Sequence, residues 1–127
     1  MNFETLLIDQ DKRGFVKLTL NRPKKRNALS AKMIDELTNF AVSLTSDIRI
    51  VIIQGAGSLF CAGGDLEWMN AQIKADRTTR ITAAKKLASM LKALNELPVP
   101  LIAKVHGAAY GGGVGLACVC DLSLIHI

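Results

Sequence analysis

The sequence has no long apolar run, since none of its apolar stretches approaches the ~20 residues that a membrane-spanning helix needs. Its first residues, MNFETLLIDQDKRG, carry acids early and lack the basic-then-apolar order of a signal peptide. They also lack the Arg-rich, acid-poor character of a transit peptide. We therefore expect a cytoplasmic protein.

Cysteine, histidine and large aromatic residues are scarce. The three cysteines, Cys61, Cys118 and Cys120, form an odd number without framework spacing, which favours reduced thiols packed in the core over disulfides. The two histidines, His106 and His126, are too few for a histidine-rich metal site. One Trp and one Tyr, without interleaved basic residues, argue against a nucleic-acid surface.

The composition favours one globular domain. The chain has 127 residues, of which 50% are hydrophobic and 21% charged, and this balance excludes a disordered protein. The formal net charge is +5, and Lys24, Lys25 and Arg26 form the densest basic cluster. This cluster indicates either a solvated surface or a site for a phosphate-bearing ligand, with nucleic acid a more distant alternative.

Strand and helix signals alternate along the chain. Runs of strand type at 3–9 and 14–21 predict a hairpin, and β-branched residues at 48–55 predict a strand covered on both faces. Ser30 is expected to cap a helix whose apolar positions recur with helical period. Those positions are Met33, Ile34, Leu37, Phe40, Ala41 and Leu44.

The second half continues this alternation. Helices are expected at 66–73 and 77–96, the second ended by Pro98 and Pro100, followed by a strand at 101–107 and a glycine-rich helix start. The apolar face predicted for the longer helix consists of Ile81, Ala84, Ala88, Leu91 and Leu94. The order of elements predicts an α/β fold with layered sheets.

Two glycine-rich turns, at 61–69 and 107–117, each lead from a strand into a helix. Two backbone N–H groups at such turns can converge on one oxygen, which is the arrangement of an oxyanion hole. The alternative is that the glycines only permit tight turns and close packing. A dinucleotide fingerprint is excluded because its third glycine is replaced by Phe60 or Leu116, and neither a phosphate loop nor a Gly-x-Ser-x-Gly elbow is present.

Three blocks resemble the signature segments of the crotonase (enoyl-CoA hydratase/isomerase) superfamily: LTLNRPKKRNALS, SLFCAGGDLEWM and PLIAKVHGAAYGGGVGLACVCDL. They occur in the family's order and cover the chain from about residue 3 to 121. The resemblance implies a spiral of strand-strand-helix turns, assembly into trimers or pairs of trimers, and acyl-CoA thioester substrates. It implies no separate cofactor, since coenzyme A is part of the substrate. Within the family, AAYGGGVGLA is most similar to bacterial methylglutaconyl-CoA hydratases of leucine breakdown.

The resemblance also implies roles for individual residues. The oxyanion-hole amides are expected at Ala62 and Gly112, and Lys24, Lys25 and Arg26 are expected near the CoA phosphates. The main-chain contacts to the adenine end of CoA are expected from Ala62, Gly63, Gly64, Asp65 and Leu66.

Four further side chains are expected to be structural. We interpret Asp65 as a helix N-cap rather than an acid-base group, and Trp68 and Met69 as acyl-pocket or core residues. Asp121 is expected to end the last helix.

The sequence departs from the family in two places. Gly115 stands where many hydratases carry the first of two glutamates, and family members continue beyond this chain to supply the second. The resemblance implies hydration of an α,β-unsaturated acyl-CoA. Because one glutamate is missing, an enoyl-CoA isomerase, which needs only one relay group, is the alternative. Two further hypotheses stay open: a non-catalytic protein that binds CoA or RNA, and an inactive fragment.

The last six residues, LSLIHI, do not look like the apolar strand that the family would place there. They coincide with one reading frame of a sequencing-library adapter. We interpret residues 1–121 as a partial crotonase-like domain and 122–127 as a non-native tail. We expect the 127 residues by themselves to be catalytically inactive and poorly folded.

Overall fold

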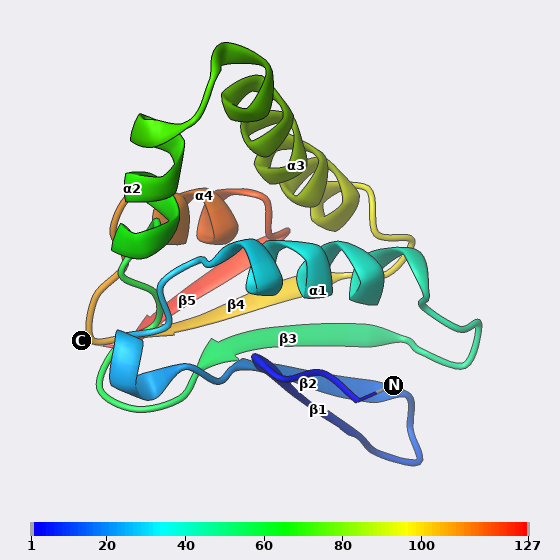
Figure 1. The fold of residues 1–127 in the computed structure, drawn as a ribbon. Helices are drawn as coiled ribbons and strands as arrows, with labels where there is room; N and C mark the ends of the chain where they lie inside the picture. The colour runs from blue at the N-terminus through cyan, green and yellow to red at the C-terminus, as the bar shows by residue number, and fades with distance from the viewer. Residues whose placement is uncertain (1, 127) are drawn as a thin grey trace.

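The structure, a computed structural model, describes residues 2–126. It is an α/β fold with one mixed sheet and a set of helices on one side of that sheet (Figure 1). Its elements, in chain order, are β1 (Leu6–Gln10), β2 (Phe15–Leu20), the 3-10 helix η1 (Pro23–Lys25), α1 (Ala31–Val42), β3 (Ile50–Gly55), α2 (Leu66–Lys74), α3 (Arg77–Asn95), β4 (Leu101–His106), α4 (Gly112–Cys118) and β5 (Leu122–His126).

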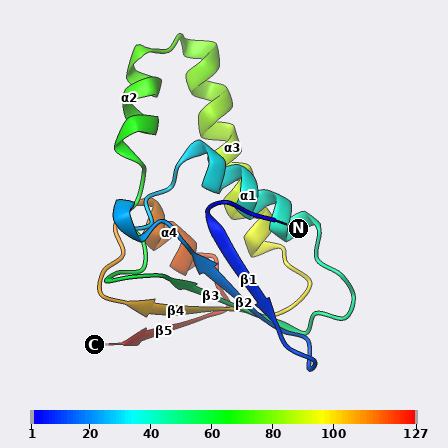
Figure 2. The ribbon, with the colours of Figure 1, turned by 60° about the horizontal axis from the view of Figure 1, so that its bottom comes forward.

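The five strands follow one another in the sheet in chain order. β1 and β2 form the expected antiparallel hairpin, with Leu6 opposite Leu20, and each later strand pairs in parallel with the one before it. Parallel neighbours require crossover connections, and α1, the α2–α3 pair and α4 supply them. Two views show α2 and α3 rising away from the sheet as a hairpin (Figures 1 and 2). Among residues 2–126, no helix is both long and apolar enough to cross a bilayer.

The core lies between the sheet and the helices. Alternate residues of the strands face it, as the period of two requires, and α1 contributes the apolar stripe that its sequence period predicted. Ser30 caps α1 as expected, because its side chain accepts a hydrogen bond from the Met33 amide at 3.2 Å. The core residues that are fully buried include Val16, Leu18, Leu20, Met33, Leu37, Val51, Ile53, Phe60, Met90 and Ala103.

The order of strands and helices up to residue 118 is confirmed, but the predicted face of α3 is largely wrong. Ile81 is 42% exposed, and Ala84 and Ala88 are exposed as well. The buried residues of this helix are Met90 and Leu94. The reason is tertiary: the first turns of α3 rise away from the sheet beside α2, so only the last turns reach the core (Figure 2).

The strand β3 is covered on one face only, which corrects the prediction of two covered faces. Val51 and Ile53 are fully buried, whereas Ile50 and Ile52 on the other face are half-buried. All helices lie on the side of Val51 and Ile53, so a continuous β-branched run was not sufficient to predict two covered faces.

Residues 122–126 form β5, which the sequence pattern did not predict. Leu122 lies opposite Ile102, and the pairing continues to His106 and His126. The expectation that this stretch does not continue as a strand is therefore wrong, and Ile127 lies outside the described residues. The proposal that residues 122–127 are non-native stays a prediction.

A buried carboxylate joins the start of the chain to α1. Glu36 accepts hydrogen bonds from the Thr5 hydroxyl at 2.6 Å, from the Thr5 amide at 2.9 Å and from the Glu4 amide at 2.9 Å. Burial raises the pKa of Glu36, but these bonds and the nearby Lys32 ammonium outweigh burial and hold the pKa below the ordinary value of 4.5.

The stability of the chain should therefore depend on pH through Glu36. Because its pKa is lowered in the folded state, its contribution is complete above pH 4.5 and is lost as the pH falls through the folded-state pKa. In urea unfolding at pH 7, Glu36→Gln should lower the free energy of unfolding by about 1–2 kcal/mol. Between pH 5 and 3 (roughly) the variant should lose less stability than the parent chain.

The Thr5→Val variant provides a graded comparison, because it removes one donor to Glu36 and leaves the carboxylate in place. It should reduce the pH dependence only in part. A Glu36→Gln variant that loses stability at low pH as steeply as the parent chain would show that other carboxylates control this region.

Candidate functional site

The first glycine turn is held between two other segments of the chain. Cys61 forms a parallel bridge with Ala109 by hydrogen bonding to the two residues on either side of Ala109. The Cys61 amide donates to the Ala108 carbonyl at 3.3 Å, and the Tyr110 amide donates to the Cys61 carbonyl at 3.0 Å. Three residues later, Gly64 bridges Leu29 in the same parallel manner. Residues 61–65 therefore lie as a short extended segment with one neighbour on each side.

Gly63 reverses the direction of the backbone amides in this segment. In an extended strand the N–H groups of residues two apart point to the same edge. The Ala62 amide donates to the Arg26 carbonyl at 3.0 Å, so a regular strand would direct the Gly64 amide toward the same loop. The φ of +91° at Gly63 breaks this alternation.

The Gly64 amide consequently faces away from the loop. Leu29 donates to the Gly63 carbonyl at 2.7 Å and accepts from the Asp65 amide at 3.0 Å, which in a parallel bridge leaves the Gly64 N–H on the opposite edge. In the described part of the chain this N–H has no hydrogen-bond partner. The assignment of Ala62 as an oxyanion-hole donor is therefore wrong in this structure, because its N–H is already bonded.

The second glycine turn also presents an unbonded amide. Gly111 has a φ of +49° and precedes α4, whose first residue is Gly112. The amides of Gly113 and Val114 bond back into the turn, to Tyr110 at 2.8 Å and Gly111 at 3.0 Å. The Gly112 N–H has no partner among the residues that the structure describes, as expected for the first turn of a helix.

The two turns touch through their backbones, and glycine is what permits it. A Cβ at Gly63 would lie 2.7 Å from the Tyr110 carbonyl oxygen, and a Cβ at Gly113 would lie 2.5 Å from the Cys61 carbonyl oxygen. Side chains at these two positions would push the turns apart. The free amides of Gly64 and Gly112 thus belong to segments in direct contact.

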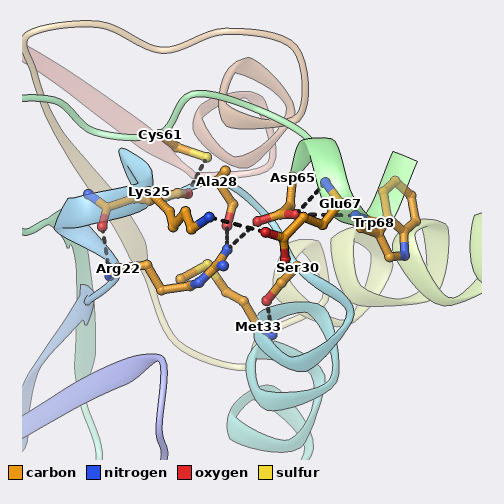
Figure 3. Close-up of polar contacts among 10 residues, drawn as sticks. Arg22, Lys25, Ala28, Ser30, Met33, Cys61, Asp65, Glu67 and Trp68 are labelled. Atoms are coloured by element: carbon orange, nitrogen blue, oxygen red, sulfur yellow. Dashed lines mark hydrogen bonds and ion pairs between the residues drawn. The ribbon is translucent and has the colours of Figure 1, made fainter. Parts of the chain in front are cut away.

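A buried ion pair fixes the start of α2. The Asp65 carboxylate caps this helix by accepting from the amides of Glu67 at 2.9 Å and Trp68 at 3.2 Å, as the sequence predicted. Its other oxygen accepts from the Arg22 guanidinium at 2.9 Å (Figure 3). Burial raises the pKa of Asp65, but Arg22 and the two amides outweigh burial and keep the pKa below 3.8. Both oxygens are committed, so this carboxylate is not available for acid-base chemistry.

A basic pocket opens beside the first turn. It has a volume of about 670 Å³, and Gly63, Gly64 and Gly111 lie in its wall. All three members of the predicted basic cluster also line it: Lys24, Lys25 and Arg26. Lys25 pairs with Glu67, which also lines the pocket, at 3.2 Å (Figure 3). This pair leaves the cluster with a net positive charge. A polyanion such as a nucleotide phosphate suits this wall.

An apolar pocket of about 430 Å³ lies between α2 and α3. Trp68, Met69, Leu87 and Leu91 are among its lining residues. Leu91 also faces α4, where a Cβ at Gly115 would lie 3.7 and 3.8 Å from its methyl groups, an ordinary contact distance. The site therefore pairs a basic pocket with an apolar one, and the two free amides belong to the turns nearby.

Two further expectations are wrong for the described residues. Cys118 is exposed rather than packed in the core, whereas Cys61 is buried and Cys120 is half-buried. Asp121 does not end α4, which stops at Cys118; its carboxylate accepts from the Leu101 amide at 2.8 Å and fixes the start of β4. Burial raises the pKa of the Cys61 thiol, which disfavours the reactive thiolate form.

The family model for enoyl-CoA hydratase/isomerase matches residues 10–126 of the chain. The chain belongs to the enoyl-CoA hydratase/isomerase family. It is 32% identical to the mitochondrial Delta(3,5)-Delta(2,4)-dienoyl-CoA isomerase of Mus musculus over 131 aligned positions, which cover 95% of this chain and 40% of the mouse protein.

Solved structures of family members share the fold. An enoyl-CoA hydratase from Mycobacterium smegmatis superposes with a TM-score of 0.90 at 38% identity, covering 95% of this chain and 47% of the other. An enoyl-CoA hydratase from Shewanella pealeana gives 0.93 at 31% identity, covering 97% and 47%. The chain spans less than half the length of these relatives, so the activity of a whole family member is a matter for proposal.

The candidate site of this enoyl-CoA hydratase/isomerase family member lies at the two glycine turns that the sequence singled out, but two residues that shape it were not predicted in these roles. Gly64 was expected only as a contact for CoA, and Arg22 was not named. The sequence offered one signal for Arg22, its place directly before Pro23 in the first matched block. No local signal distinguishes the Gly64 amide from the Ala62 amide, because the difference depends on which segment lies on each edge.

Proposed function

We propose that this chain forms the acyl-CoA site of an enoyl-CoA hydratase/isomerase and stabilises a thioester enolate between two backbone amides. The observation that carries the proposal is the pair of unbonded N–H groups, Gly64 and Gly112, on two turns in contact. We replace the donor pair expected from the sequence, Ala62 and Gly112, with this one. Each donor to a developing oxyanion is worth about 3 kcal/mol of transition-state stabilisation.

The two pockets support the same substrate class. The basic pocket beside Gly64 suits the phosphates and adenine end of coenzyme A, with Lys24 and Arg26 in its wall. The apolar pocket between α2 and α3 suits an acyl group. The thioester joins the CoA part of the ligand to its acyl part, so its carbonyl would lie where the two turns meet.

The proton relay is the part of the reaction that these residues leave open. Hydration of a double bond needs a base for water and an acid for the α-carbon. Asp65 is fully bonded and Gly115 has no side chain, so neither supplies a proton. We propose a hydratase, in line with relatives of 38–39% identity that are named enoyl-CoA hydratases. An isomerase is the alternative, which Gly115 and the similarity to a dienoyl-CoA isomerase support, because isomerisation needs only one relay group.

An enolisable probe tests the proposal without requiring a proton relay. Acetoacetyl-CoA ionises to an enolate with its own ultraviolet absorption, and an oxyanion hole should lower the pKa of the bound probe relative to the free one. Loss of two donors worth about 3 kcal/mol each would abolish this shift. If the chain binds CoA but leaves the pKa of bound acetoacetyl-CoA unchanged, the oxyanion-hole proposal is wrong.

The basic pocket leads to a prediction about salt. The affinity for CoA should fall as ionic strength rises, because exposed charges are screened over about 10 Å at 0.1 M salt. Changing Lys24, Lys25 and Arg26 together to Gln should flatten this dependence. At low salt it should weaken binding about tenfold, as three exposed pairs of about 0.5 kcal/mol would require.

Calorimetric titration of CoA at several salt concentrations measures this effect. The matched control is a triple Gln variant at Arg77, Lys85 and Lys92 on α3, which removes the same charge away from the basic pocket. Equal slopes in the pocket variant and the control would mean that the cluster is only a solvated surface.

We also propose that the family assembly, a trimer or a pair of trimers, applies to the protein that carries this chain. We propose the cytoplasm as its location, while the mouse relative is named as mitochondrial.

A further inference from the structure

One nitrogen of Arg22 joins the chain neighbours of the two residues, Leu29 and Gly64, whose bridge directs the Gly64 amide. Its Nη1 donates to the Ala28 carbonyl at 2.6 Å and to the Asp65 carboxylate at 2.9 Å (Figure 3). Ala28 directly precedes Leu29, and Asp65 directly follows Gly64, so the guanidinium lies beside the Leu29–Gly64 bridge. The side chains of Arg22 and Asp65 are 19% and 6% exposed.

The Leu29–Gly64 bridge is short and lies beside flexible backbone, so a side chain that joins its two sides can fix its geometry. It is an isolated bridge between two loops, outside the named strands, with two hydrogen bonds. Its glycine side contains Gly63 and Gly64, whose backbones have the greatest torsional freedom of any residue. A rotation of the peptide between them would turn the Gly64 N–H away from its present direction.

Arg22 itself is held in place from the other side of the loop. Its backbone amide donates to the Asn27 side-chain oxygen at 2.9 Å. Asn27 is fully buried and donates to the carbonyls of Ala56 at 2.8 Å and Leu59 at 3.0 Å, on the segment that leads into the first turn. Through Asn27, the arginine that joins residues 28 and 65 is thus tied to the segment that leads into the first turn.

We infer that Arg22 is a positioning residue that fixes the direction of the Gly64 amide by joining Ala28 and Asp65 across the Leu29–Gly64 bridge. The inference rests on the proposed function of the Gly64 and Gly112 amides as an oxyanion hole. Arg22 touches neither amide, so its effect on a bound thioester would pass through the bridge.

The double variant Arg22→Met with Asp65→Asn removes this connection with the least damage to the fold. A single change at either position would leave a buried charge without its partner, which is strongly destabilising. The double variant removes both charges, and Asn is as good an N-cap for α2 as Asp. The matched control is the double variant Asp35→Asn with Lys86→Met, which also removes one acid and one base, from an exposed ion pair of 3.2 Å outside the basic and apolar pockets.

The experiment compares CoA with acetoacetyl-CoA as ligands of the protein that carries this chain and of its variants. We expect the double variant to bind CoA within about twofold of the parent chain, since Lys24, Lys25 and Arg26 stay in place, the net charge is the same, and Asn keeps the backbone of position 65 in the pocket wall. The equilibrium constant for enolate formation of bound acetoacetyl-CoA should fall at least about tenfold, because a misdirected donor loses most of its effect. The control double variant at Asp35 and Lys86 should change neither quantity.

The outcomes separate the inference from the proposed function. A parent chain that binds neither ligand, or binds acetoacetyl-CoA without shifting its ionisation, overturns the proposed function and this inference with it. A parent chain that shifts the ionisation while the folded double variant shifts it equally overturns the inference alone. A parallel loss of CoA binding and enolate formation, or an equal loss in the control double variant at Asp35 and Lys86, also overturns it, because Arg22 would then have only a structural role.

Discussion

The Gly63→Ala variant should unfold at a markedly lower urea concentration than the parent chain, with a loss of about 2–4 kcal/mol in the free energy of unfolding. Two costs add at this position. The φ of +91° is one that residues with a Cβ rarely adopt, and the new Cβ would lie 2.7 Å from the Tyr110 carbonyl oxygen. That neighbour is backbone, so the two turns would have to separate.

The neighbouring Gly64→Ala variant is the control for this prediction. A Cβ there would lie 3.3 Å from the Met69 sulfur, at the end of a flexible side chain that can move aside. We expect its free energy of unfolding to stay within about 1 kcal/mol of the parent value. Equal losses in the two variants, measured by circular dichroism in urea, would show that close contact of the turns does not depend on Gly63.

The Gly112→Pro variant should lower the enolate-forming equilibrium of bound acetoacetyl-CoA about a hundredfold, and any turnover of an enoyl-CoA by a similar factor. Proline removes the N–H that we assign to the oxyanion hole. Proline also suits the first position of a helix, so α4 need not be disrupted. The added ring would meet the Leu29 Cδ1 atom, 2.7 Å from the position of a Cβ, and this methyl group is able to rotate away.

The control for this variant is Gly115→Ala in the same helix. Its Cβ would make ordinary contacts with Leu91, and alanine is a better helix former than glycine by about 1 kcal/mol. It should bind acetoacetyl-CoA and form the enolate as the parent chain does. A folded Gly112→Pro variant with the enolate equilibrium of the parent chain would remove Gly112 from the proposed oxyanion hole.

The sequence by itself determined most of the secondary structure and the two glycine turns at which we propose the site. The hairpin, the Ser30 cap with the apolar period that follows it, the Asp65 cap and the two strand-to-helix glycine turns are local features. Each depends on residues a few positions apart, whose spacing can be read along the chain. The three signature blocks identified the family for the same reason, since they are contiguous stretches.

Only the tertiary structure decided how these elements are used. It buried Met90 and Leu94 of α3 instead of the face read from the period, because the α2–α3 hairpin rises away from the sheet. It left Ile52 of β3 half-buried, because the helices cover one face of the sheet. It also gave Asp121 a role at the start of β4, twenty residues away along the chain.

The direction of a backbone amide is the clearest case. Ala62 and Gly64 are equivalent in the sequence as small residues of one turn, yet the Ala62 N–H is bonded to Arg26 and the Gly64 N–H is free. The difference arises from the positive φ of Gly63 and from the Leu29 bridge, which Arg22 supports from a distant part of the chain. Hydrogen-bond direction depends on which segments lie on each edge of a turn, and that is set by packing between residues far apart in the sequence.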